Sequence, residues 1–92
     1  MTKTWKTKKL KILAHTFAQM DDETDILLFL RDVCTLEELD EISSRFEVAQ
    51  LLLQGKPYRA IAKQTGVSTA TITRIAHWIK EGEGGYEKAL KK

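Results

Sequence analysis

The amino-acid sequence predicts a small all-α protein that folds as a single domain over residues 1–92. Apolar residues recur at three- and four-residue spacing in several separate segments, which is the periodicity of amphipathic helices. No stretch shows the apolar–polar alternation of a β-strand over a useful length. A chain of 92 residues can bury only one modest core, so it often needs a staple or a second chain for stability.

Two helices are predicted in the N-terminal third. An apolar stripe predicts the first helix over Lys6–Met20, and its members are Leu10, Leu13, Phe17 and Met20. After an acidic break, Thr24 and Asp25 can cap a second helix over about Asp25–Val33. Residues 26–30 (ILLFL) are apolar almost all round, so this helix needs cover on all sides. Because so short a chain offers little cover, residues 1–34 are predicted to mediate dimerisation.

A long central helix is predicted over residues 35–55. It starts with residues 35–38 (TLEE), a capping box in which Thr35 and Glu38 satisfy backbone amides reciprocally. Its apolar stripe comprises Leu39, Ile42, Phe46, Ala49 and Leu53, with Leu52 beside them. Gly55 supplies the stop, and Pro57 can occupy the first turn of the next helix. Near the C-terminus, three glycines end the last well-marked helix, and a short helix is predicted over residues 86–92.

The most specific pattern is a helix-turn-helix over residues 57–81, centred on Tyr58–Lys80. Two helices that cross steeply need a small residue at their approach, a turn residue that tolerates positive φ, and a cap on the second helix. Ala62, Gly66 and Ser68 meet these needs in order. The inward apolar positions are Ile61, Val67, Ile72 and Ile75.

The polar face of the second helix in this motif suits the major groove of DNA. Small hydroxyl residues and one arginine can enter a groove roughly 12 Å wide. The predicted DNA-binding residues on this face are Ser68, Thr69, Ala70, Thr71, Thr73, Arg74 and His77. On the first helix of the motif, Arg59 and Lys63 can bind phosphates. The alternative interpretation is an ordinary helical hairpin with a polar outer face.

Charge is distributed unevenly, although the net charge is only +2. Residues 1–11 hold five lysines and no acid, whereas residues 20–41 hold nine acids and a single arginine. Residues 42–92 then carry nine basic residues against four acids. Basic ends around an acidic middle suit a protein that faces a polyanion with one side. For the N-terminal lysines, a solvated tail is the alternative.

The sequence offers no support for catalysis, metal binding or membrane insertion. Cys34 is the single cysteine, and only His15 and His77 could join it, so neither a disulfide nor a zinc site is expected. No nucleophile with its base and orienting group is visible. The chain has no signal-peptide pattern and no apolar run of membrane-spanning length. We therefore expect a soluble cytoplasmic protein that is not an enzyme and has no cofactor.

Several stretches resemble the Trp repressor superfamily, and more closely its YerC/YecD-type branch. The resemblance covers about Thr35–Tyr86 and is carried by residues 36–39 (LEEL), 45–55 (RFEVAQLLLQG), 58–62 (YRAIA), 65–74 (TGVSTATITR) and 84–86 (GGY). It implies an intertwined homodimer with interlocking N-terminal helices and one reading head on each side. The first functional hypothesis is a transcriptional regulator, such as a repressor, that binds a palindromic operator in double-stranded DNA. The alternative is a protein-interaction module that kept the fold and lost operator specificity.

The resemblance also points to a ligand pocket, from which this sequence departs. In Trp repressor, tryptophan lies between the central and recognition helices, and Thr35, Arg45 and Arg74 align with residues near it. Ile75, however, stands where a glycine admits the indole, and Trp78 replaces a small serine. We interpret these five positions as a vestigial pocket whose space Ile75 and Trp78 fill, so we expect no tryptophan-dependent regulation.

Two roles are open for the arginines of this pocket. Arg45 and Arg74 either clamp a ligand carboxylate or pair with Glu38, Glu41 or a phosphate. The second role is favoured, and the question of another small-molecule effector stays open.

Overall fold

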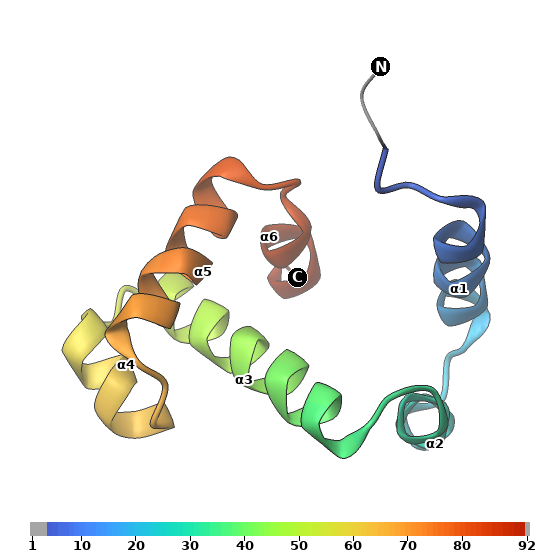
Figure 1. Ribbon diagram of the computed structural model, residues 1–92, viewed down its shortest axis with the longest axis horizontal. Helices are drawn as coiled ribbons and strands as arrows, with labels where there is room; N and C mark the ends of the chain where they lie inside the picture. Colours follow the sequence, from blue (N-terminus) through green and yellow to red (C-terminus); the bar gives the residue numbers. More distant parts are fainter. Residues whose placement is uncertain (1–3, 92) are drawn as a thin grey trace. The chain divides into compact units, whose positions relative to one another are not determined.

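The computed structural model describes residues 4–91, and every regular element in that range is an α-helix. The helices are α1 (Lys8–Gln19), α2 (Glu23–Val33), α3 (Leu36–Leu53), α4 (Tyr58–Thr65), α5 (Thr69–Glu81) and α6 (Gly85–Leu90), as shown in Figure 1. The all-α fold class is therefore confirmed. The chain forms two compact units, Met1–Leu36 and Glu37–Lys92. Within residues 4–91, no helix combines the length and apolar character needed to cross a bilayer.

In the first unit, side-chain caps define where the helices begin. Thr7 caps α1 by accepting a hydrogen bond at Oγ1 from the Leu10 amide, 3.2 Å away, so the helix starts at Lys8 and not at Lys6. Asp22 caps α2 by accepting from the Thr24 amide at 2.8 Å. The expectation that residues 24 and 25 cap this helix is therefore wrong, because the aspartate before them already satisfies the first free amide.

α1 and α2 contact each other but bury little apolar surface. The rings of Phe17 and Phe29 meet edge to face, with centroids 5.3 Å apart. Neither helix contains a buried residue, and Leu27 and Leu28 are 59% and 62% exposed. Within residues 26–30, the apolar run predicted to need cover on all sides, these two leucines are thus open to solvent in a single chain, and the other three residues are half-buried.

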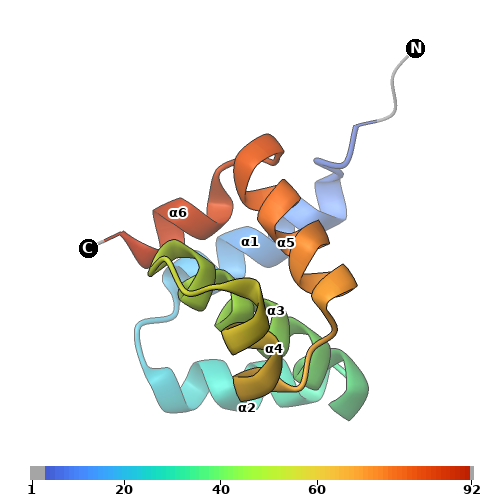
Figure 2. The same cartoon turned by 90° about the vertical axis from the view of Figure 1, so that its left-hand side faces the viewer.

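The core lies in the second unit, where α4 and α5 pack on the C-terminal half of α3 (Figures 1 and 2). Its buried members are Val48, Ala49, Leu51, Ile61, Ile72 and Ile75. Half-buried apolar residues pack around them, namely Leu52, Ala62, Val67, Ile79 and Tyr86. The inward positions predicted for the helix-turn-helix are therefore confirmed, with Val67 at the edge of the core and the three isoleucines inside it.

The buried face of α3 differs from the predicted stripe. Of that stripe only Ala49 is buried, whereas Ile42, Phe46 and Leu53 are exposed. Val48 and Leu51 are buried instead, because α4 and α5 pack on the neighbouring face of the helix. α3 therefore has one apolar face in the core and a second one facing solvent.

The ends of the remaining helices follow local backbone rules. At the end of α3 the amides of Gly55 and Lys56 donate to the carbonyls of Leu52 and Leu51, and Gly55 has φ +83°, which together form a Schellman motif. Pro57 lies just before α4 as its N-cap and not inside the first turn as expected. The C-terminal helix was predicted over residues 86–92. It is observed over Gly85–Leu90, and residue 92 of the predicted span lies outside the described residues.

Candidate nucleic-acid interface

The turn between α4 and α5 depends on a left-handed glycine. Gly66 ends α4 with φ +77°, and its amide donates to the Ala62 carbonyl at 2.9 Å. Thr65 Oγ1 donates to the Ile61 carbonyl at 2.7 Å and accepts from the Val67 amide at 3.1 Å. The chain therefore turns within residues 66–68, and the amides of Gly66 and Val67 are both hydrogen-bonded there. A Cβ on Gly66 would meet no atom within 4 Å, so the positive φ alone favours glycine here.

The second helix of the motif begins at a hydrogen-bonded cap. Ser68 Oγ accepts from the Thr71 amide at 3.2 Å, as predicted for its capping role, and donates to Thr71 Oγ1 at 3.1 Å. Thr71 Oγ1 also accepts from the Arg74 guanidinium at 3.2 Å. These bonds hold the Arg74 side chain against the first turn of α5, whose free amides carry the positive end of the helix dipole.

Burial of one face of α5 decides which residues the other face presents. Ile72 and Ile75 are fully buried against α3 and α4. Of the predicted DNA-binding positions in this segment, those exposed are Ser68, Thr69, Ala70, Thr73, Arg74 and His77, and Thr71 is half-buried. Arg59 and Lys63 are exposed on α4. The structure thus places the predicted set on the outside of one helical hairpin, and their contacts with DNA stay a prediction.

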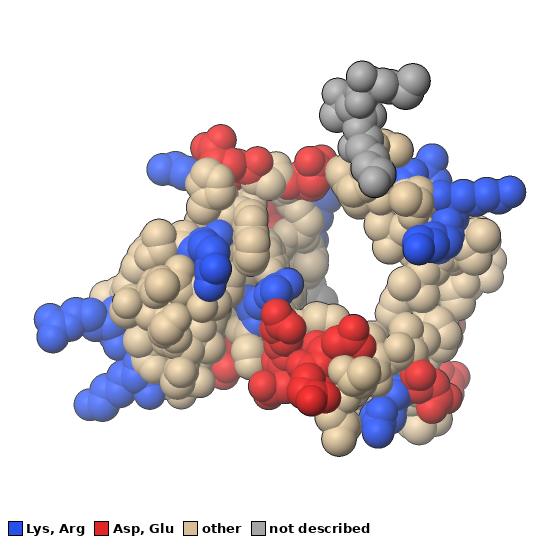
Figure 3. Space-filling view, viewed as in Figure 1, with Lys and Arg blue, Asp and Glu red and all other residues tan. Residues whose placement is uncertain are grey.

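This hairpin contains no carboxylate before Glu81, which is the last residue of α5. Residues 57–80 contain four lysines and arginines and no aspartate or glutamate. In Figure 3, basic side chains extend from the part of the surface that α4 and α5 form. A surface with cations and no acids attracts a polyanion without local repulsion.

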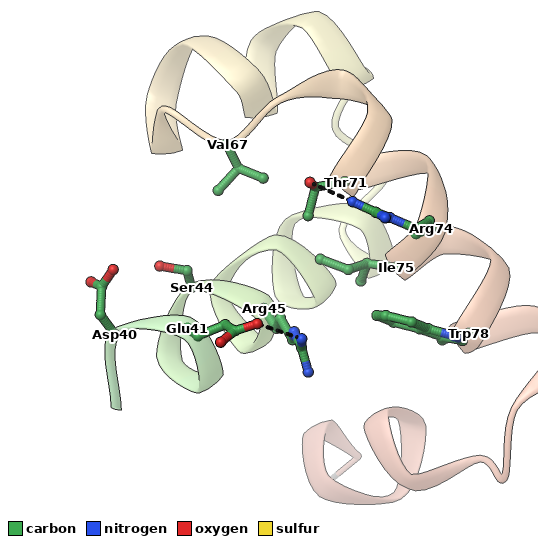
Figure 4. Close-up of a pocket in the computed structure, with 9 residues that line it drawn as sticks. All are labelled: Asp40, Glu41, Ser44, Arg45, Val67, Thr71, Arg74, Ile75 and Trp78. Atoms are coloured by element: carbon green, nitrogen blue, oxygen red, sulfur yellow. Dashed lines mark hydrogen bonds and ion pairs between the residues drawn. The ribbon is translucent and has the colours of Figure 1, made fainter. Parts of the chain in front are cut away.

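A hollow of about 510 Å³ separates α5 from the N-terminal half of α3 (Figure 4). From α3 it is lined by Asp40, Glu41, Ser44 and Arg45, and from the turn and α5 by Val67, Thr71, Arg74, Ile75 and Trp78. Arg45 Nη2 forms an ion pair with Glu41 Oε1 at 2.7 Å, one of the roles considered for this arginine. The Arg45 guanidinium also lies over the Trp78 ring, 5.5 Å from its centroid.

The hollow corrects one expectation about the vestigial pocket. Four of the five predicted residues line it; Thr35 does not. Ile75 is fully buried in the core and Trp78 is 42% exposed, so both side chains form the walls of the space and do not fill it. Asp40 and Ser44 were not predicted as wall residues. Their four-residue spacing parallels that of Glu41 and Arg45, which is the signal that could have placed them on this face.

Comparison with known proteins shows both a family and a shared fold. A family model described as Trp repressor protein matches residues 8–92. The uncharacterized protein YerC of Bacillus subtilis (strain 168) is 36% identical over 83 residues, which cover 90% of this chain and 80% of that protein. The crystal structure of a TrpR-like protein from Eubacterium eligens has 36% identity and a TM-score of 0.87, over 94% of this chain and 89% of that one. A crystallised candidate Trp repressor from Staphylococcus aureus has 29% identity and a TM-score of 0.85, over 92% and 85%.

Proposed function

Because the chain belongs to the Trp repressor family, whose fold is that of non-enzymatic DNA-binding regulators, we propose that it is a sequence-specific transcriptional regulator. It acts as a homodimer on a palindromic operator. One observation carries the proposal: α4 and α5 bury their apolar faces on α3, and residues 57–80, which contain no aspartate or glutamate, turn small hydroxyl residues and cations outward.

Base recognition is assigned to the N-terminal half of α5. Thr69, Ala70 and Thr73 are exposed and small, so the helix axis can approach the floor of the major groove closely. A threonine hydroxyl can donate to or accept from a base edge, and its methyl group can contact the methyl of thymine. Arg74, whose guanidinium donates a hydrogen bond to Thr71, is within the same turn and binds a phosphate or a guanine.

Phosphate binding is assigned to α4. Arg59 and Lys63 are one helical turn apart and exposed, so both can reach one strand of the backbone. These contacts position the hairpin and do not distinguish sequences.

The case for a homodimer rests on apolar surface that one chain leaves uncovered. α1 and α2 contain no buried residue, and on α3 Leu36 and Ile42 are 64% and 53% exposed. In each unit, exposed apolar residues of this kind are typical of an interface. A second copy of the chain can cover this surface with its own apolar side chains. The two helix-turn-helix units of the dimer then bind half-sites roughly 34–36 Å apart.

The operator is found by selecting bound sequences from a random pool of duplexes with the purified protein. Thr73→Ala is then expected to relax specificity at one base position at a cost of about 1–3 kcal/mol. Lys63→Ala is expected to weaken binding to all DNA sequences alike. It is also expected to reduce the slope of log affinity against log salt by about one. Lys88→Ala on α6 removes an equal charge outside the hairpin and serves as the control. Unchanged affinity of Thr73→Ala for every sequence would refute this recognition surface.

Sedimentation tests the dimer. At micromolar concentration the mass is expected to be about twice the chain mass of 10.5 kDa. Leu28→Asp is expected to abolish the folded dimer, because burial of an unpaired charge at the interface costs several kcal/mol. Thr4→Asp adds the same charge at an exposed position before α1 and is the control. A stable folded monomer of the unmodified protein would contradict the proposal.

L-tryptophan is not the corepressor in this proposal. A ligand carboxylate in the hollow would face Asp40 and Glu41, and it would have to displace Glu41 from Arg45. Repulsion between the ligand carboxylate and these two side-chain carboxylates opposes binding. Calorimetry with millimolar tryptophan is expected to show no binding heat. The affinity of the protein for its operator is expected to stay unchanged when tryptophan is added. Saturable micromolar binding with a matching gain in operator affinity would restore Arg45 and Arg74 as a carboxylate clamp.

A further inference from the structure

α1 presents lysines where helix electrostatics disfavour them. Lys8 and Lys9 occupy its first turn, which contains no acidic residue, although the positive end of the helix dipole favours acids there. Lys6 precedes the helix and Lys11 follows one turn after Lys8. All four lysines are exposed, and in Figure 3 lysine side chains extend from this helix into solvent.

No carboxylate in the same segment compensates these charges. Residues 4–20 contain four lysines and no aspartate or glutamate, and among the described residues no ion pair joins any of the four lysines to an acid. The cap is uncharged, since Thr7 Oγ1 accepts the Leu10 amide. The helix is therefore stabilised by a neutral cap while its cations repel one another and the dipole. A polyanion would relieve both effects at once.

We propose that the lysine surface of α1, defined as Lys6, Lys8, Lys9 and Lys11, is a second phosphate-binding site for duplex DNA. The inference rests on the proposed function, which supplies the polyanion, and on charge complementarity. Lys8 and Lys11 share one face of α1, so their ammonium groups can engage neighbouring phosphates. Trp5 is exposed, and Lys6 Nζ lies 5.6 Å from its ring centroid, a cation–π contact that favours one position for this cation. Such binding is independent of base sequence.

The test measures the salt dependence of binding to duplexes of random sequence. Each phosphate that a lysine neutralises contributes about 0.9 to the slope of log affinity against log salt. For a dimer, Lys8→Gln with Lys11→Gln is expected to reduce the slope by about 3 to 4. The control pair is Lys88→Gln in α6 with Lys91→Gln at its C-cap, which has the same spacing in sequence and is expected to leave the slope unchanged. Lys8→Arg with Lys11→Arg is expected to preserve the slope, because the charges remain.

A melting curve separates this effect from misfolding. The variant Lys8→Gln with Lys11→Gln is expected to melt at the same temperature as the unmodified protein or higher, because it relieves repulsion in the first turn of α1. Weaker binding by a variant that is at least as stable supports a binding role.

Several results would overturn the inference. An unchanged slope in the α1 variant, while Lys63→Ala still lowers it, would refute the second site and leave the proposed function intact. An equal loss in the α6 control would assign the effect to net charge and also refute the site. No salt-dependent DNA binding by the unmodified protein would refute both proposals. Lysine-dependent binding to phosphatidylglycerol vesicles, without a change in DNA slope, would assign the surface to membranes.

Discussion

Gly66 and Gly85 allow the turn of the helix-turn-helix to be tested by one chemical change at two sites. An added Cβ meets no atom within 4 Å at either glycine, so steric clash plays no part. The two positions differ in backbone conformation: Gly66 has φ +77°, whereas Gly85 is not a positive-φ residue and is the first residue of α6. The pair therefore isolates the cost of the left-handed conformation.

The expected effects have opposite signs. Gly66→Ala places a Cβ in the left-handed region at a cost of about 1–2 kcal/mol, partly offset by about 0.4–1 kcal/mol from the lower entropy of the unfolded chain. The net loss is about 1 kcal/mol. Gly85→Ala has no such cost and gains helix propensity, so it is expected to stabilise the protein by about 0.5 kcal/mol.

Thermal unfolding followed by circular dichroism, at one fixed protein concentration, measures both. A change of 1 kcal/mol shifts Tm by about 4–8 °C in a domain of this size. Gly66→Ala should therefore lower Tm by several degrees, and Gly85→Ala should raise it slightly. If Gly66→Ala has the same Tm as the unmodified protein, or if both variants lose stability equally, the left-handed turn does not control stability and the reasoning fails.

Other substitutions test the cap, the core and the hollow, all read from the same unfolding transition. Ser68→Ala removes the acceptor for the Thr71 amide and is expected to destabilise by about 1 kcal/mol; a neutral result would show that the cap is dispensable. Ile61→Ala opens a cavity at a fully buried position and is expected to cost about 2–5 kcal/mol, so a cost below 1 kcal/mol would place this residue outside the core. Glu41→Gln breaks an exposed ion pair and is expected to change stability by less than about 0.5 kcal/mol; a larger loss would mean that Arg45 depends on it.

The sequence alone was enough to locate α4, α5 and the turn between them, because their signals are local. Gly66 and Ser68 act on backbone groups within four residues of themselves, so their roles can be read without knowledge of any distant contact. Helical periodicity likewise placed Ile61, Ile72 and Ile75 on inward faces, where all three are fully buried. The starts of α1 and α2 each differ from the predicted starts by two residues, because Thr7 and Asp22 cap these helices.

The tertiary structure decided which of several possible surfaces is used. α3 carries apolar residues on two faces, and only the packing of α4 and α5 selected Val48 and Leu51 over Ile42 and Phe46 for the core. Tertiary packing also left space beside Ile75 that its size alone did not reveal, since the volume of a hollow depends on how far apart two helices lie. Periodicity identifies a face of one helix, whereas burial of that face requires a second helix, and the distance and angle between the two depend on residues far apart in the chain.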